Sequence, residues 1–591
     1  MFRLYSTANK DFRIDHKNEN ATLSLSLESE QECVSIYKFT LSFNTPTALF
    51  PITIKWNEPM LGVLSSWNPA IFRNRGLTQW SSPLTNASNF YKGAPIIALI
   101  NQGSLNYSTV SLSESEYDAK LQSSVNDFEE KENLLLTCIL FKGGEVLQNY
   151  TLYIRIDNDR NKPFYQSIPA ACKWWDTFYP DCSAPTVNGE LPLYSSWYNY
   201  HQHPESFTME RELEIASKMG FGSVIIDDGW SYDGSGSGDY LDCGNWQVAT
   251  SKFPDFKGFI EKAHLLNLKV ALWFPVPFIG YNNPDFERFR DKMYYLTDEF
   301  RTGVVDPRYP EVRKYIIDSY KSIVNTYRLD GLKLDFIDFF QPYGNVTPYK
   351  NCGGAEGKDC DGIEAGVIKL LTEIKEEFTR DHSDFMIEFR QPYFSPSIVR
   401  FCNMLRVGDC PFDLIKNRMG VIDLRLFDYN VAVHADMLYW AFNESTENCA
   451  IQLYNILFSV PQISVLLSKI NDEQFFLIEK YLDYWKNNKN IILHGDFKAY
   501  NPEFNYTFAS SENALKRIAV SYLNDYYKFD GKETDLFNAT EKTEYCVENT
   551  TDKPAAIVVY DCLGNVTSTL SLGAKEIKKI FVKKAGRISF Q

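Results

Sequence analysis

The segments GSVIIDDGW (222–230) and GLKLDF (331–336) decide how the central part of this chain folds. Each is a short apolar run with a carboxylate at or near its end, which is typical of a buried parallel strand. A strand-like run (193–198) and a helix with Met209 and Leu213 on its apolar face precede the first segment. Together these elements predict a strand-helix-strand unit with parallel strands.

The same alternation of strand-like and helix-like segments continues to about residue 470. Eight strand candidates are separated by segments of helix length, and they are 193–198, 222–228, 270–274, 331–336, 385–389, 404–409, 432–438 and 461–467. Eight such repeats in about 300 residues predict an α/β fold of the (β/α)8 TIM-type barrel class.

The segments on either side of this barrel have a different pattern. Short alternating runs up to about residue 160 predict an antiparallel β-sandwich. Residues 156–190 lack periodicity and are rich in turn formers, so we place a domain boundary there. Strand-like runs return from about residue 495. We therefore expect an N-terminal β-sandwich over 1–170, the barrel over 185–490 and a C-terminal antiparallel β-domain over 495–591.

Composition restricts the class of protein and the class of partner. The 591 residues are 44% hydrophobic and 23% charged, which is typical of a globular protein. A net charge of −16 without a dense basic run argues against nucleic acid as a partner. The longest apolar run, residues 270–279, is about half the length that a bilayer requires, so we expect no membrane partner. The sequence is compatible with a homo-oligomer.

The N-terminal residues, the cysteines and the histidines give expectations about the protein's location, thiols and cofactors. The first 15 residues contain no apolar stretch of signal-peptide length, and the 12 Cys form no CxxC pair, so we expect a cytoplasmic location with free thiols. Seven His without an HExxH motif predict no metal centre, and we expect no cofactor. The Gly/Ser loop 233–239 lacks the terminal Glu of an EF-hand, and we interpret it as an active-site loop.

Charged residues gather where the predicted barrel strands end, which is where the active site of such a barrel lies. Carboxylates with interspersed cations suit glycoside hydrolysis, in which one carboxylate attacks and one carboxylic acid protonates the leaving oxygen. For a single Asp, a salt bridge or a helix cap is the more frequent role, but that alternative weakens when several strand ends share the feature. The residues are Asp227, Asp228, Lys333, Asp335, Glu388, Arg390, Arg406 and Asp409.

The order of the motifs is informative as well. SSWYNY, VIIDDGW, ALWF, DPRYPEVRKY, GLKLDF and LRVGDCPFD follow one another over roughly residues 190–470. This order resembles that of the melibiase-type α-galactosidases of glycoside hydrolase clan D. The resemblance implies a retaining, exo-acting α-glycoside hydrolase, most directly an α-galactosidase, with a small carbohydrate substrate. An α-N-acetylgalactosaminidase or a transglycosylase on the same scaffold, and a glycan-binding barrel without catalysis, stay as alternatives.

The resemblance also implies roles for individual residues. Asp335, in the K-x-D strand, matches the nucleophile, and Asp409 matches the general acid/base. Asp413 is the alternative acid, although it lies farther from the strand end. Asp227 and Asp228 match paired aspartates that bind hydroxyls at the far side of a galactosyl ring.

Further residues match the walls of the family's sugar site. Lys333 and Trp273 match a substrate-binding Lys and a Trp that lines the ring, and Arg301 and Arg406 match arginines of the clan. The segment IEFRQPY (387–393) replaces a Cys- and Gly-rich motif that contacts the sugar's 2-position, so Glu388 and Arg390 are expected there and the 2-substituent stays open. Trp246 is a candidate sugar platform, although a lone Trp is more often a core residue.

Overall fold

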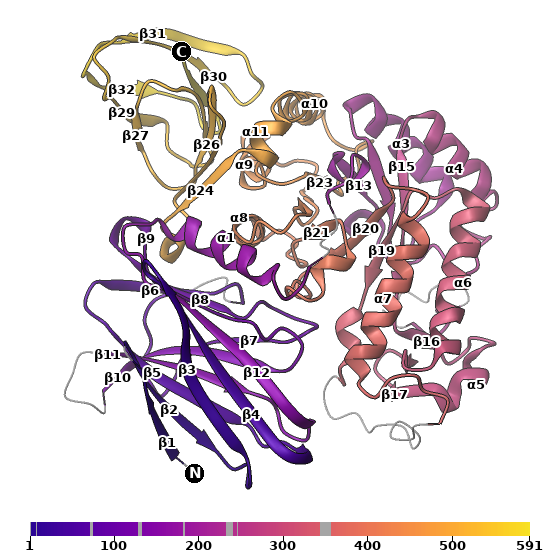
Figure 1. The fold of residues 1–591 in the computed structure, drawn as a ribbon. Helices are drawn as coiled ribbons and strands as arrows, with labels where there is room; N and C mark the ends of the chain where they lie inside the picture. Colours follow the sequence, from indigo (N-terminus) through magenta and orange to yellow (C-terminus); the bar gives the residue numbers. More distant parts are fainter. Residues whose placement is uncertain are drawn as a thin grey trace.

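A computed structural model describes residues 2–7, 9–70, 75–127, 133–180, 184–231, 240–244, 246–342 and 356–591. Three parts follow one another along the chain: an indigo-to-purple β-rich part, a magenta-to-orange barrel with helices around its strands, and a yellow β-rich part (Figure 1). The Gly/Ser loop 233–239, our expected active-site loop, lies outside the described residues.

The N-terminal part is a sandwich of two six-stranded antiparallel sheets, as the alternating pattern predicts. Along β5, for example, Ile52, Ile54 and Trp56 are buried between the sheets while Thr53 and Lys55 face outward. One sheet runs in the order β1 (Phe2–Ser6), β2 (Asp11–His16), β5 (Ile52–Pro59), β11 (Asn133–Leu140), β10 (Ala119–Asn126) and β7 (Leu84–Ser88). The other contains β3 (Thr22–Gln31), β4 (Val34–Ala48), β12 (Val146–Asp157), β9 (Leu105–Leu112), β8 (Ile96–Asn101) and β6 (Val63–Trp67).

The central part is the predicted barrel, and all eight strand candidates form parallel strands. Isolated bridges from His434 to Val460 and from Leu438 to Ile463 join its last two strands and close the ring. The strands in chain order are β13 (Leu193–Ser195), β14 (Ser223–Ile226), β15 (Lys269–Pro275), β19 (Gly331–Asp335), β20 (Met386–Arg390), β21 (Met404–Arg406), β22 (Ala432–His434) and β23 (Gln462–Ile463).

Helices surround these strands because each has one apolar face to bury. The helix predicted before residue 220 ends there, where Gly220 takes a left-handed φ of 100° that closes the helix. The helices are α2 (Trp197–Tyr200), α3 (Ser206–Met219), α4 (Phe256–Leu265), α5 (Phe286–Phe289), α6 (Pro310–Tyr327), α7 (Ile363–Thr379), α8 (Leu414–Leu426), α9 (Thr446–Asn455), α10 (Asp472–Asn487) and α11 (Lys489–His494).

A small three-stranded antiparallel sheet interrupts the barrel between its third strand and α6, and the sequence pattern does not predict it. It consists of β16 (Phe278–Gly280), β18 (Thr302–Val305) and β17 (Met293–Thr297). Strands of three to five residues are too short to show a clear alternation of apolar and polar residues. Arg301 lies in the turn between β17 and β18, with a left-handed φ of 52°.

The C-terminal part consists of a seven-stranded and a three-stranded sheet. Most neighbouring strands are antiparallel, but β26 pairs with β28 and β27 pairs with β29 in parallel, which corrects the expectation of a purely antiparallel domain. The strands are β24 (Asp496–Tyr500), β25 (Phe508–Glu512), β26 (Lys516–Ser521), β28 (Glu533–Asn538), β33 (Arg587–Phe590), β30 (Ala555–Tyr560) and β31 (Val566–Leu572), then β27 (Tyr526–Phe529), β29 (Glu544–Asn549) and β32 (Ile577–Phe581).

One buried carboxylate ties the three parts together. Asp423 of α8 accepts hydrogen bonds from the indole of Trp67 (3.1 Å) and the guanidinium of Arg75 (2.5 Å), both from the sandwich. It also accepts one from the hydroxyl of Tyr506, which lies between β24 and β25. Helix α1 (Phe164–Trp175) packs between the sandwich and α8. These contacts hold the flanking parts against the barrel.

Three further structural findings bear on the class of protein. No helix in the described part of the chain is long and apolar enough to cross a membrane. Among the residues that the structure describes, no group of three or more His, Cys, Asp or Glu is arranged to hold a metal ion. The cysteines within the described ranges form no disulfide with one another.

Candidate active site

Asp335 is the last residue of β19, and its buried carboxylate is bound from several sides. Its Oδ1 atom accepts hydrogen bonds from the guanidinium Nε of Arg390 (2.7 Å), the hydroxyl of Tyr393 (3.2 Å) and the backbone N–H of Phe336 (2.7 Å). Its Oδ2 atom accepts one from the indole N–H of Trp273 (3.0 Å). Phe336 has a left-handed φ of 59°, which turns the chain away from the barrel directly after Asp335.

These contacts decide the charge of Asp335. Burial by itself raises the pKa of this carboxyl, but the cations of Arg390 and Lys333 and the indole of Trp273 outweigh it and hold the pKa well below its usual value. Burial raises the pKa of Tyr393 well above its usual value, so this phenol stays neutral and can donate. Asp335 is therefore ionised at neutral pH, as a carboxylate nucleophile requires.

Lys333 connects Asp335 to the carboxylates at the end of the second strand. Residues two apart in a strand share a face, so Lys333 and Asp335 both point into the barrel. The Lys333 ammonium lies 2.6 Å from Oδ2 of Asp227, and both side chains are almost fully buried. Asp228 is 1% exposed, and its Oδ2 accepts a hydrogen bond from the amide of Gln202 at 2.8 Å.

The turn after these aspartates requires a glycine. Gly229 has a φ of +99°, and a Cβ atom there would lie 2.4 Å from the backbone oxygen of Gln202. The backbone N–H of Asp227 donates to the hydroxyl of Ser196 at 2.9 Å. The DDG order in VIIDDGW thus allows both carboxylates to stand at the strand end.

Arg406, the last residue of β21, binds three carboxylates at once. Its Nη2 donates to Asp409 (2.9 Å) and its Nη1 to Asp436 (2.5 Å). Its Nε lies 3.6 Å from Oε1 of Glu388, which is too far for a good hydrogen bond. The other oxygen of Glu388 accepts a hydrogen bond from the amide of Gln462 at 2.7 Å.

Several buried polar atoms on this side of the barrel have no hydrogen-bond partner within the described chain. They are Oε1 of Glu388, Nε of Arg406, Oε1 of Gln462 and Nε2 of Gln391. Buried polar atoms without partners are costly, so their presence in one place indicates a site for a polar ligand.

Asp436 is a site residue that the sequence analysis missed. It follows β22 and is fully buried. Besides Arg406, its carboxylate accepts hydrogen bonds from the hydroxyl of Tyr198 (2.8 Å) and the backbone N–H of Cys410 (2.7 Å). These bonds hold both the arginine that contacts Asp409 and the residue next to Asp409. The available signal was a carboxylate within the strand candidate AVHADML (432–438).

Asp409 itself stands at the mouth of the barrel, where 48% of its side chain is exposed. Burial by itself raises the pKa of this carboxyl. The cations of Arg406, Arg390 and Lys333 lower the pKa by more than burial raises it, so the net shift is downward. Asp413, the alternative acid, is instead the N-cap of α8 and accepts a hydrogen bond from the backbone N–H of Lys416 at 3.0 Å. Its cap role favours Asp409 as the acid.

Two candidate substrate residues stand apart from this group. Trp246 is 3% exposed and packs on Trp230, Phe274 and Tyr320, so its contacts are those of a core residue and not of a sugar platform. The pattern misled because core and platform tryptophans look alike in a sequence. Arg301 has an exposed side chain in the β17–β18 turn, and its role in binding substrate stays a prediction.

Residues 193–379 of the chain match the melibiase family. The matched segment runs from the first barrel strand, β13, to the end of α7. A curated relative, alpha-galactosidase 2 of Pediococcus pentosaceus, is 27% identical over 170 residues, which are 28% of this chain and 23% of that protein. The chain therefore aligns with less than a quarter of this relative's length. The matched stretch includes Asp227, Asp228, Trp273, Lys333 and Asp335.

Solved structures extend the likeness beyond residues 193–379. The α-galactosidase of Lactobacillus brevis is similar with a TM-score of 0.62 and 12% identity, over 100% of this chain and 83% of that one. A GH36 α-galactosidase of Geobacillus stearothermophilus in complex with raffinose is similar with a TM-score of 0.60 and 12% identity, over 98% and 83% of the two chains. At this identity the likeness concerns the fold, and it includes the flanking β-rich parts.

Proposed function

We propose that this chain is a retaining, exo-acting α-galactoside hydrolase. The observation that carries the proposal is the pair of carboxylates at the ends of the fourth and sixth barrel strands: Asp335 is buried and ionised, whereas Asp409 is half-exposed at the mouth. Retaining hydrolysis needs one carboxylate that attacks and one carboxyl group that exchanges protons. The match to the melibiase family supports an α-galactoside as substrate.

In the first step, Oδ2 of Asp335 attacks the anomeric carbon and the bond from that carbon to the leaving oxygen breaks. We assign Oδ2 because its one hydrogen bond in the structure comes from Trp273, whereas Oδ1 accepts three. Asp409 gives its proton to the leaving oxygen. A covalent ester between Asp335 and the sugar results.

In the second step, water attacks the anomeric carbon, Asp409 takes the proton from the water, and the bond to Asp335 breaks. The charge of Asp335 raises the pKa of Asp409, and ester formation removes this charge. The pKa of Asp409 therefore falls once the ester has formed, so the acid of the first step becomes the base of the second. Substrate that covers the half-exposed carboxyl raises its pKa before the first step, because desolvation disfavours the charged form.

The sugar ring is proposed to lie between the two buried groups of charged residues. Asp227 and Asp228 accept hydrogen bonds from the 4- and 6-hydroxyls, with Lys333 neutralising their charge. A 2-hydroxyl placed between Oε1 of Glu388 and Nε of Arg406 supplies the partner that both atoms lack. Because both side chains are buried, this end favours a hydroxyl over an acetamido group, and so galactose over N-acetylgalactosamine.

A panel of nitrophenyl glycosides tests the proposal. We expect hydrolysis of the α-galactoside, at least tenfold slower hydrolysis of the α-N-acetylgalactosaminide, and none of the β-galactoside. Proton NMR of the first turnovers is expected to show α-galactose before mutarotation. Initial β-galactose contradicts retention, and a preference for another α-sugar contradicts the assigned substrate. Disaccharide products with added acceptor sugars identify a transglycosylase.

A further inference from the structure

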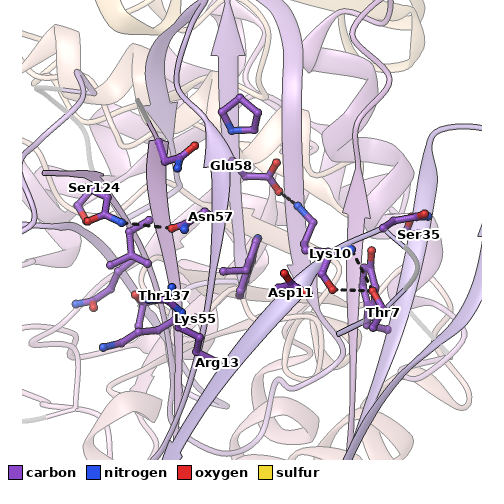
Figure 2. A pocket seen from close by; sticks show the side chains of 18 of the residues that line it. Thr7, Lys10, Asp11, Arg13, Ser35, Lys55, Asn57, Glu58, Ser124 and Thr137 are labelled. Carbon is purple, nitrogen blue, oxygen red and sulfur yellow. Dashed lines mark hydrogen bonds and ion pairs between the residues drawn. The ribbon is translucent and has the colours of Figure 1, made fainter. Parts of the chain in front are cut away.

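A large polar cavity lies outside the barrel, on the N-terminal sandwich. It has a volume of about 1370 Å³, and all of its lining residues belong to the first 158 residues of the chain. Its floor is the outer face of the sheet that contains β2, β5, β11 and β10, and Figure 2 shows side chains from these strands pointing into it. The proposed active site contributes no residue to it, so the cavity requires an explanation of its own.

The strand register places polar side chains of this face in rows across the sheet. Arg13 pairs with Lys55, Lys55 with Thr137 and Thr137 with Gln122, so these four residues form one row. Four strands spaced by about 4.8 Å span about 14 Å. The row next to it contains Asn57, Leu135 and Ser124. The face is thus an extended strip and not a compact pocket.

The chemistry of the lining favours a neutral polyhydroxylated ligand. Amides and hydroxyls, which both donate and accept hydrogen bonds, make up much of the lining: Thr53, Asn57, Gln122, Ser124, Asn126, Asn133 and Thr137. The cations are offset by acids, since Lys10 pairs with Glu58 and Lys55 lies 4.0 Å from Asp15. An anionic ligand therefore finds little excess positive charge here.

An exposed tryptophan borders this face. Trp80 is 45% exposed at one border, and the exposed part of its ring can contact the apolar face of a sugar ring. Apolar side chains such as Leu135 and Ile139 lie among the polar ones across this face, whereas the centre of a stable protein interface is mostly apolar. A sugar chain fits this lining better than a second protein surface does.

We propose that this sheet face is a second carbohydrate site, which binds the backbone of a galactosyl-bearing polysaccharide such as galactomannan while the barrel removes galactosyl side groups. The inference rests on the proposed function for the identity of the sugar. Hydroxyls of the backbone exchange hydrogen bonds with the amide and hydroxyl rows, and Trp80 stacks on one ring. Binding here raises the local concentration of side groups at the barrel.

Affinity electrophoresis in gels that contain galactomannan tests the site. The Asp335→Ala chain serves as the reference, because it leaves the polysaccharide intact. We expect galactomannan to retard this chain, and we expect Trp80→Ala or Gln122→Ala in the same background to weaken binding on the order of tenfold. Phe581→Ala, which removes an exposed aromatic ring from β32, is the matched control and is expected to keep full retardation. Equal retardation of all variants overturns the proposal.

Kinetic measurements on protein that keeps Asp335 distinguish failure of the second site from failure of the proposed function. Trp80→Ala is expected to leave kcat/KM on nitrophenyl α-galactoside unchanged and to raise KM on galactomannan. Hydrolysis of the nitrophenyl substrate without any retardation by galactomannan overturns the second site and leaves the proposed function intact. Retardation that depends on Trp80 without any hydrolysis overturns the proposed function alone. Melting temperatures check that both sheet variants are folded.

Discussion

The ends of the fourth and sixth barrel strands carry the same residue type in opposite environments. Asp335 is buried and accepts four hydrogen bonds, two of them from Arg390 and Trp273. Asp409 is half-exposed, with a hydrogen bond to its carboxylate from Arg406. A buried carboxylate stays charged only where donors and cations compensate for lost water. Environment, more than residue type, therefore separates the proposed nucleophile from the proposed proton donor.

The difference also shows how an arginine can act on two groups. Arg390 binds Asp335 directly, and it lowers the pKa of Asp409 as well. Both carboxyl groups are thus coupled to one cation, and a change in the charge of either alters the other. Substitutions that remove Asp335 or Asp409, or that change the surroundings of the site, test this difference.

Asp335→Ala is expected to abolish turnover of an α-galactoside, because no other group can form the covalent ester. Added azide attacks the anomeric carbon in a single displacement, so the product is the β-galactosyl azide. Product analysis by NMR measures the outcome. Substantial activity without azide contradicts the assignment of Asp335. Asp413→Ala is the control, since loss of its helix cap costs about 1 kcal/mol of stability and leaves the chemistry in place.

Asp409→Ala is expected to lower kcat/KM by about 10²–10⁴-fold on substrates with poor leaving groups, which need protonation. The loss is smaller on a nitrophenyl galactoside, because its leaving group departs without a proton. Azide intercepts the ester on Asp335, so the product is now the α-galactosyl azide. The same azide product from Asp335→Ala and Asp409→Ala means that the two roles are wrongly divided.

Asp228→Asn is expected to lower kcat/KM on the order of tenfold or more, because a charge-assisted hydrogen bond to the sugar is typically worth about 1.5–3 kcal/mol. The melting temperature is expected to change little, since the amide has the same shape and the Gln202 amide that donates to Oδ2 is neutral. Kinetics and thermal melting are measured on one preparation. An unchanged kcat/KM with a lower melting temperature identifies a structural pair and not a sugar clamp.

Asp436→Asn is expected to act on Asp409 through charge. Loss of the negative charge beside Arg406 lowers the pKa of Asp409, so the protonated acid is lost at a lower pH. The basic limb of the pH profile of kcat/KM therefore moves to lower pH. Tyr198→Phe removes a hydrogen bond to Asp436 but keeps the charge, and it is expected to leave the limb in place. An identical shift in both variants indicates a packing effect.

The sequence could not reveal the roles of residues whose importance comes from partners in other strands. Asp335 and Lys333 were predictable, because both stand in one strand and their spacing puts them on one face. Asp436 and Gln462 were not, because the importance of each arises from contacts with Arg406 and Glu388 across the barrel. The small sheet β16–β18–β17 was missed for a different reason, since its strands are too short to show a period.

The sequence by itself determined the barrel, because eight apolar runs at regular spacing can bury their side chains only as parallel strands covered by helices. It also determined that carboxylates stand at the strand ends. The tertiary structure alone decided how these groups differ: it left Asp409 half-exposed, made Asp413, the alternative acid, a helix cap, and placed Trp246 in the core. Burial, charge compensation and contact arise from residues far apart in the chain, and local patterns do not contain them.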